Sequence, residues 1–124
     1  MTFRFILKSR EGISCLLGLL QIKKGTHMIH EIVIQQVQPE KRDEYIKVFG
    51  EILTKANYAG SHGIRFFTSI EDPSRVILII DWDSVEAHTQ HRGTPTHTAM
   101  REVTSKYQTA KSDGAHFLMH EVRH

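Results

Sequence analysis

The 124-residue sequence has one cysteine, three prolines, one tryptophan and no long apolar run. With Cys15 as the single cysteine, an internal disulfide framework is excluded, and we expect a cytoplasmic protein. The apolar stretch at residues 13–20 is far shorter than the roughly 20 residues that span a bilayer, so no membrane protein is expected. Lys23 and Lys24 follow it without a small-residue cleavage site, which argues against a secretory signal.

The sequence also lacks a strong excess of charge of either sign. Sixteen Lys and Arg residues against fourteen Asp and Glu residues give a net charge of +2, which is too small to indicate a nucleic-acid-binding protein. Apolar residues make up 40% of the chain and charged residues 24%, as in ordinary globular domains. Histidine is abundant instead, with nine copies. The chain is long enough for one domain with a real core.

The charge is unevenly placed along the chain. Residues 1–27 contain five basic residues and one acid, a net of +4, whereas residues 28–124 contain eleven basic and thirteen acidic residues, a net of −2. A regular pattern of secondary structure begins only at Met28. We therefore expect an N-terminal extension over residues 1–27 that is not part of the fold, and one domain over residues 28–124.

The pattern from Met28 onward predicts six elements. Residues 29–37 are β-branched and partly alternating, which favours a strand. Pro39 begins a helix that reaches about residue 56, with an apolar stripe at spacings of three and four. Residues 61–70 and 75–82 predict two strands joined by a turn over residues 71–74.

The second half of the domain repeats the helix–strand order. Asp83 or Ser84 caps a helix that is broken over residues 93–95 and begins again at Thr94 and Pro95, reaching about residue 107. Residues 115–122 predict a last strand. The order β-α-β-β-α-β is typical of the ferredoxin-like α+β fold, a four-stranded antiparallel sheet with helices on one face.

The alternating apolar residues of the third predicted strand indicate that both faces of the sheet need to be covered. Val76, Leu78, Ile80 and Trp82 point to one side, and Ile77 and Ile79 point to the other. Because the helices cover only one side, the apolar residues of the other side need a cover. Stacking two sheets in a homodimer is the simplest solution.

At these residues the chain resembles the antibiotic biosynthesis monooxygenase (ABM) family of dimeric α/β barrels. The matching pieces are, in chain order, a first strand led by Met28, residues 63–66 opening the second strand, the turn at residues 71–73, Asp81 with Trp82 ending the third strand, and residues 91–95 with His97 over the helix break. The resemblance covers residues 28–122.

The resemblance implies a homodimer with a pocket between each sheet and its helices. Several family members oxygenate quinols, anthrones or related aromatics with O2, without flavin, haem or metal. Others degrade haem or isomerise small signalling molecules. The resemblance therefore implies that this protein is an oxidoreductase, namely a monooxygenase that oxidises a small aromatic or quinol substrate without a cofactor.

Departures from the family pattern separate its branches. The haem-degrading branch has a Trp about nine residues after the strand-end Trp and a haem-binding His about ten residues further on, whereas this chain has His91 and Arg101 there. In the polyketide-tailoring branch, substrate-binding Asn and Tyr residues stand where this chain has Leu78 and His88. The small quinol-oxygenase branch therefore fits best. Haem degradation, isomerisation and a non-catalytic ligand-binding dimer remain as alternatives.

The candidate site residues surround the helix break. We expect His91 to be the catalytic base, because a neutral imidazole takes the proton of a phenolic hydroxyl group at ordinary pH. Trp82 and either Phe66 or Phe67 are expected to shape an aromatic pocket. His97 and Arg65 are expected to orient substrate oxygen atoms.

A metal site is the other interpretation of the histidines. His88 and His91 are three residues apart, which allows two ligands from one helix, and His97 would be a third. No HExxH motif or cysteine cluster accompanies them. We therefore expect no metal.

Overall fold

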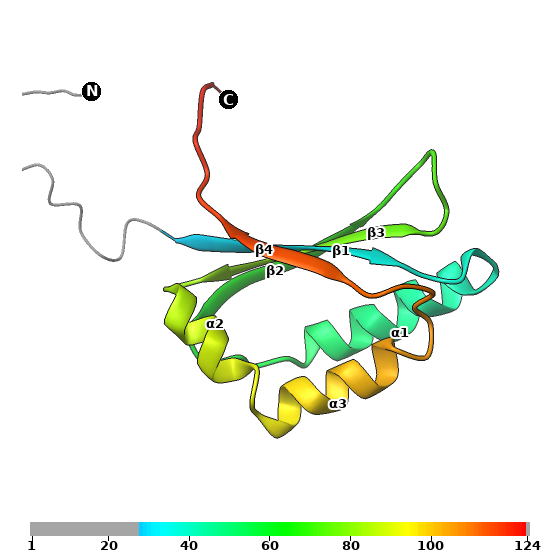
Figure 1. Cartoon of the computed structure of the whole chain (residues 1–124), viewed down its shortest axis with the longest axis horizontal. Coiled ribbons are helices and arrows are strands. Elements are labelled where there is room, and N and C mark those ends of the chain that lie inside the picture. Colours follow the sequence, from blue (N-terminus) through cyan, green and yellow to red (C-terminus); the bar gives the residue numbers. More distant parts are fainter. Residues whose placement is uncertain (1–27, 124) are drawn as a thin grey trace, which may run out of the picture.

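The computed structural model describes residues 28–123 and shows the ferredoxin-like arrangement (Figure 1). The elements are β1 (Ile29–Gln36), the short 3-10 helix η2 (Pro39–Lys41), α1 (Arg42–Thr54), β2 (Ser61–Thr68), β3 (Arg75–Trp82), α2 (Val85–His91), α3 (Pro95–Thr104) and β4 (Asp113–Phe117). The strands form one antiparallel sheet in the order β2-β3-β1-β4. All three α-helices lie on one face of it (Figure 1). The predicted fold class is confirmed, while the predicted N-terminal extension lies outside the described residues.

The core lies between the sheet and its helices. On β3 the residues alternate as the sequence predicts, with Val76, Leu78, Ile80 and Trp82 buried. From α1, the stacked rings of Tyr45 and Phe49 pack onto this face, with centroids 4.9 Å apart. The alternation of β3 therefore determines which face of the sheet receives the helices.

The bounds of the last strand differ from those predicted, which were residues 115–122. β4 starts two residues earlier because Asp113 and Gly114 pair with Ile34 and Val33 of β1. It stops at Phe117, whose partner is His30, next to the first residue of β1. The same register places Leu118 opposite Ile29, the first residue of β1, so only one residue of β1 remains beyond the last pair, and β4 ends although the apolar side chains that follow favour a strand.

The corner between α2 and α3 is fixed by two capping residues. The hydroxyl oxygen of Ser84 accepts from the Ala87 amide at 3.1 Å and starts α2. The Thr94 hydroxyl oxygen accepts from the His97 amide at 3.3 Å and starts α3, with Pro95 in its first turn. These caps place His91 at the end of one helix and His97 at the start of the next.

Gly60 allows α2 to lie close to the start of β2. Its φ is +86°, a conformation that L side chains rarely adopt. A Cβ atom there would lie 2.7 Å from the Cβ atom of Ala87, and the Gly60 carbonyl accepts from the Asp83 amide at 2.8 Å. Glycine at this position therefore fixes where α2, and with it His88 and His91, sits against the sheet.

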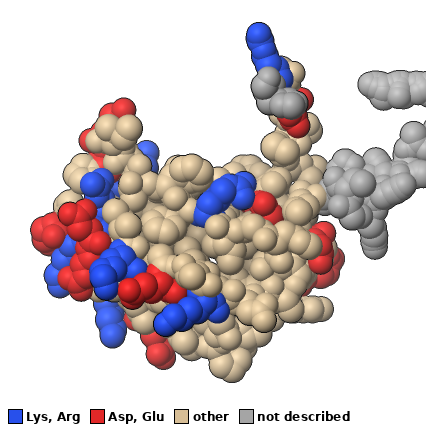
Figure 2. All heavy atoms as spheres, turned by 180° about the vertical axis from the view of Figure 1, so that it is seen from behind, with Lys and Arg blue, Asp and Glu red and all other residues tan. Residues whose placement is uncertain are grey.

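The outer face of the sheet carries apolar side chains that no helix covers. Ile34, Phe67 and Phe117 are 39%, 53% and 48% exposed. Seen from behind, the charged residues gather at the end of the molecule that carries the β2–β3 turn, and much of the remaining surface in view is uncharged (Figure 2). Within residues 28–123, every helix is too short or too polar to cross a membrane.

Candidate functional site

A cavity of about 310 Å³ lies between the sheet and helices α2 and α3. Strands β1, β3 and β4 form the floor of the cavity. Helix α3 contributes one of its faces to the wall, through the side chains of His97, Met100, Arg101 and Thr104. Tyr58 closes the α1 side. The volume is at the small end of ligand pockets and suits a ligand of one or two aromatic rings.

His91 lies in the wall of this cavity and its tautomer follows from its neighbours. The Thr94 hydroxyl group donates its only proton to the His91 carbonyl at 2.8 Å, so toward the His91 Nδ1 atom, 3.5 Å away, it can only accept. This contact favours the tautomer with the proton on Nδ1, in which Nε2 keeps its lone pair. The Nε2 atom is buried without a hydrogen-bond partner in the described structure. This is the state that a general base requires.

Aromatic rings surround the His91 imidazole. The Tyr58 ring centroid lies 4.1 Å away and that of Trp82 5.5 Å away, and the His97 ring meets it edge-on at 5.2 Å. Burial, followed by the positive charge of a protonated His97, lowers the pKa of His91. His91 therefore stays neutral at ordinary pH.

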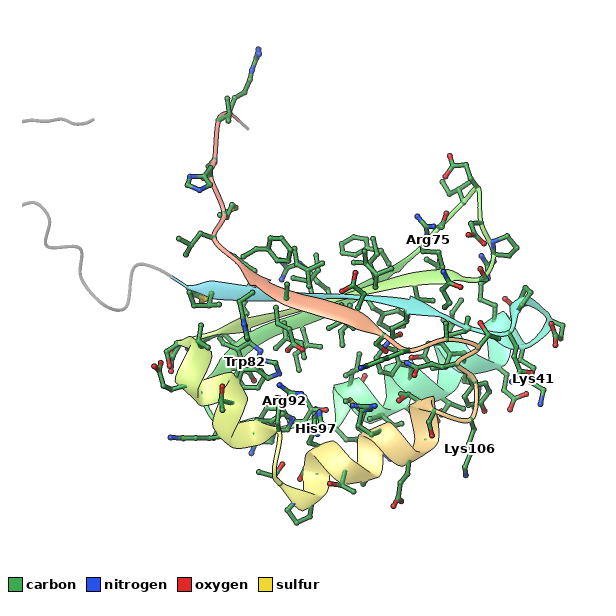
Figure 3. All side chains as sticks on the ribbon, viewed as in Figure 1. Lys41, Arg75, Trp82, Arg92, His97 and Lys106 are labelled. Atoms are coloured by element: carbon green, nitrogen blue, oxygen red, sulfur yellow. The ribbon has the colours of Figure 1, made fainter. Side chains whose placement is uncertain are left out.

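His97 also lines the cavity and lies between two arginines. Burial, and then the charges of Arg101 and Arg92, lower its pKa, while a hydrogen bond from its ring to the Arg92 carbonyl opposes the shift. Trp82, Arg92 and His97 lie together at the α2 end of the molecule, away from Lys41 and Arg75 (Figure 3). The two sequence-predicted histidines thus share one cavity with an unforeseen arginine pair.

A chain of four interacting side chains runs from Trp82, behind the cavity wall, to His116, through two hydrogen bonds and one ion-pair contact. The Trp82 Nε1–H group donates to the Glu31 carboxylate at 3.0 Å, and the other Glu31 oxygen lies 3.3 Å from Nε2 of His88. The His88 Nδ1 atom is 2.7 Å from Nε2 of His116. An ionised Glu31 requires the His88 proton on Nε2, so His116 then donates to Nδ1. Glu31 thereby orients both rings.

Burial keeps His88, the central member of this chain, uncharged. Burial, followed by the charges of His116 and Arg92, lowers the pKa of His88 to about 4. Burial also raises the pKa of Glu31, against the Trp82 hydrogen bond that lowers it. Both shifts have desolvation as their largest cause.

The structure separates the other sequence-predicted site residues. Trp82 lies behind the cavity wall, fully buried, with its ring stacked 5.1 Å from that of His88. Phe66 packs on Phe49 in the core. Arg65 and Phe67 are on the outer face of the sheet, where Arg65 donates to Asp81 at 3.0 Å.

The histidines do not converge as metal ligands. His91 is directed toward His97, whereas His88 is bonded to His116 and lies next to Glu31. In the part of the chain that the structure describes, no group of three or more His, Cys, Asp or Glu side chains could hold a metal ion.

Sequence reasoning missed Glu31, Tyr58, Arg92 and His116 as cavity residues. The position of Glu31 could have been predicted. It is in phase with Val33 and Val37 on an alternating strand, so its carboxylate lies on the side of the sheet that faces the helices. No local pattern links it to His116, because that contact comes from the pairing of β1 with β4.

His88 makes a testable contribution to the pH dependence of stability. The groups around it are Glu31 on β1, His116 on β4, and His91, Arg92 and His97 on or next to the helices. Its folded-state pKa of about 4 lies below the roughly 6.5 of an unfolded histidine. Between these values only the unfolded chain binds the proton, so stability falls as the pH falls through that window, by about 2 kcal/mol near pH 5.

Other cavity groups modify this effect. His91 and His97, whose pKa values are also lowered, add to the loss, and Glu31, whose pKa is raised, offsets part of it. Urea denaturation at neutral pH and near pH 5 should show the loss, and His88→Gln should flatten the dependence. His62→Gln, at an exposed histidine, is the control. Equal pH dependence in wild type and His88→Gln would contradict this.

Comparison with known proteins places the chain by sequence and by fold. The family model described as antibiotic biosynthesis monooxygenase matches residues 28–103. No curated protein matches the chain. Many solved structures match the chain. The three described next are less than 25% identical to it in sequence, so this likeness shows the fold alone.

Three of these structures illustrate the likeness. A Bordetella bronchiseptica protein, provisionally described as an antibiotic biosynthesis monooxygenase, has a TM-score of 0.69 at 24% identity, with 78% of this chain and 99% of that chain covered. A Caulobacter crescentus protein with the same provisional description has a TM-score of 0.66 at 23% identity, covering 77% and 92%. A conserved Methanosarcina mazei protein has a TM-score of 0.66 at 15% identity, covering 76% and 94%.

Proposed function

Because the chain belongs to the antibiotic biosynthesis monooxygenase family, we propose that it oxygenates a small phenolic or quinol substrate with O2 in the cavity between the sheet and helices α2 and α3. His91 is the base in this proposal, and no cofactor takes part. The single observation that carries it is the buried Nε2 atom of His91 in the cavity wall, which has no hydrogen-bond partner in the described structure and belongs to an imidazole whose pKa is lowered.

The surroundings of His91 support this chemistry. An aromatic hydroxyl group loses its proton to a neutral base, and the phenolate that forms is electron-rich enough to reduce O2 by one electron. Tyr58 and the apolar side chains of Leu78, Ile80 and Met100 form part of the wall, which limits access of water to the reacting atoms. The His97 ring meets His91 edge-on, so substrate reaches Nε2 by displacing that ring.

The reaction balances without an external reductant. After proton transfer to His91 and electron transfer to O2, the substrate radical and superoxide combine and form a carbon–oxygen bond. The O–O bond then breaks, one oxygen atom remains on the ring as a carbonyl, and the other leaves as water with hydrogen from the substrate. A quinol and O2 thus give a hydroxyquinone and water, and the substrate supplies all of the electrons.

An oxygen electrode tests the proposal with matched substrates. Wild-type protein is expected to consume O2 with naphthols or quinols at a rate proportional to enzyme concentration. The methyl ethers of the same compounds, which have no hydroxyl proton to lose, should give no uptake. Uptake with none of the free hydroxyl compounds, or equal uptake with their ethers, would contradict the proposal.

The function is proposed for a homodimer joined through the outer face of the sheet. Ile34, Phe67 and Phe117 supply its exposed apolar surface. Phe67→Asp is expected to give a folded monomer in sedimentation velocity, because it places a charge in the apolar contact. Lys47→Asp, on the exposed side of α1, is the control. A monomeric wild-type protein would contradict the dimer.

A further inference from the structure

The cavity wall carries more fixed positive than negative charge. Arg92, Arg101 and Lys111 line it, and Glu31 is the one carboxylate among its described lining residues. The histidines of the wall whose pKa values are lowered stay neutral and do not change this balance. An empty cavity of this charge attracts an anion.

The cavity arginines are also without an acidic partner, unlike three other arginines of the domain. Arg42, Arg65 and Arg75 each lie within 4.0 Å of a carboxylate oxygen of Asp43, Asp81 or Asp72. Over residues 28–123, neither the Arg92 nor the Arg101 side chain has an ion pair or hydrogen bond to an acid. Guanidinium groups remain charged at all ordinary pH values, so two cations that make no direct contact with a carboxylate lie beside the cavity.

Both arginines line the same cavity. Arg101 is one helical turn after His97 on α3, and Arg92 directly follows α2, so the two reach the cavity from neighbouring elements. The charges of both act on His97, and that of Arg92 also reaches Glu31 and His88. Figure 3 shows Arg92 and His97 together between the helices and the sheet.

We propose that Arg92 and Arg101 form an anion subsite beside His97, so that the cavity takes a hydroxylated aromatic acid whose carboxylate they bind. The planar guanidinium fork matches a carboxylate, and charge-assisted hydrogen bonds of this kind are about twice as strong as neutral ones. The carboxylate then anchors the ring at the α2–α3 corner, with its hydroxyl group directed to His91. That the bound acid is a substrate rests on the proposed function, whereas its binding does not.

Calorimetric titration without O2 tests the subsite apart from turnover. The probes are a hydroxynaphthoic acid with its two substituents on opposite rings and the corresponding primary carboxamide, which has the same shape without the charge. Wild-type protein is expected to bind the acid about tenfold or more tighter than the amide. Added salt should weaken binding of the acid and leave the amide nearly unchanged.

Variants assign the effect to the two arginines. Arg92→Gln and Arg101→Gln are each expected to weaken binding of the acid about tenfold and to change binding of the amide little. Both side chains are exposed, so the fold should be kept. Arg75→Gln, at the opposite end of the sheet, should leave both affinities unchanged. Equal wild-type affinity for the two probes, or the same loss for both in the arginine variants, would overturn the subsite.

The outcomes also separate this inference from the proposed function. Tight, arginine-dependent binding of the acid without O2 uptake on aeration would support the subsite and contradict the oxygenase function. O2 uptake with the amide at the same kcat/KM as with the acid would support the function and contradict the subsite.

Discussion

Replacing Trp82 with alanine is expected to lower the free energy of unfolding by about 4 kcal/mol or more, because the change removes a buried ring from the centre of the core. Trp82 is fully buried against the rings of Tyr58 and His88. Its indole N–H group is also the hydrogen-bond donor to Glu31, and loss of a donor to a buried carboxylate adds about 1–3 kcal/mol.

Urea denaturation followed by far-ultraviolet circular dichroism measures this loss, since Trp82 is itself the fluorescent group of the chain. Trp82→Phe keeps most of the ring and removes the N–H group, so a smaller loss is expected. Ile70→Ala, after β2 and 93% exposed, is the control and should cost the least. A Trp82→Ala protein as stable as Ile70→Ala would show that Trp82 is not a central core residue.

Replacing His91 with phenylalanine is expected to reduce kcat for O2 uptake by about 10²- to 10⁴-fold, with a smaller change in KM. Phenylalanine retains a flat ring against Tyr58 and Trp82 and lacks the Nε2 lone pair. The deficit should shrink as the pH approaches the pKa of the substrate hydroxyl group, because substrate that is already ionised needs no base.

That pH dependence distinguishes a base from a packing residue. Wild-type kcat should vary little over the neutral range, since the pKa of His91 is lowered and the imidazole is already neutral there. Thr94→Val removes the oxygen that accepts the Nδ1 proton and should give an intermediate loss with the fold kept. A His91→Phe protein with wild-type kcat, or with a deficit that is constant over pH, would contradict the role of His91.

Local patterns were sufficient to predict most of the fold. The alternation of apolar residues on β3 predicted its bounds and its buried face, and the capping residues Ser84 and Thr94 predicted where the last two helices begin. Both signals act over a few residues. The end of β4 was missed because it depends on the register with β1, a partner far away in the sequence.

The site was predictable only in part, for the same reason. His91 and His97 flank one helix break, so their proximity follows from local structure. Phe66 and Phe67 are consecutive on a strand and face opposite sides, and Arg65 is in phase with Phe67, which places both away from the cavity. The Glu31–His88–His116 chain joins three elements, and no local pattern shows it.

The central claim is that the cavity beside His91 inserts oxygen from O2 into an aromatic substrate. Mass spectrometry after turnover under O2 labelled with the heavy oxygen isotope tests it most directly. The account predicts one labelled oxygen atom in the organic product and the other in water, with this incorporation lost in His91→Phe. A product without label, with the labelled oxygen recovered as hydrogen peroxide, would contradict it.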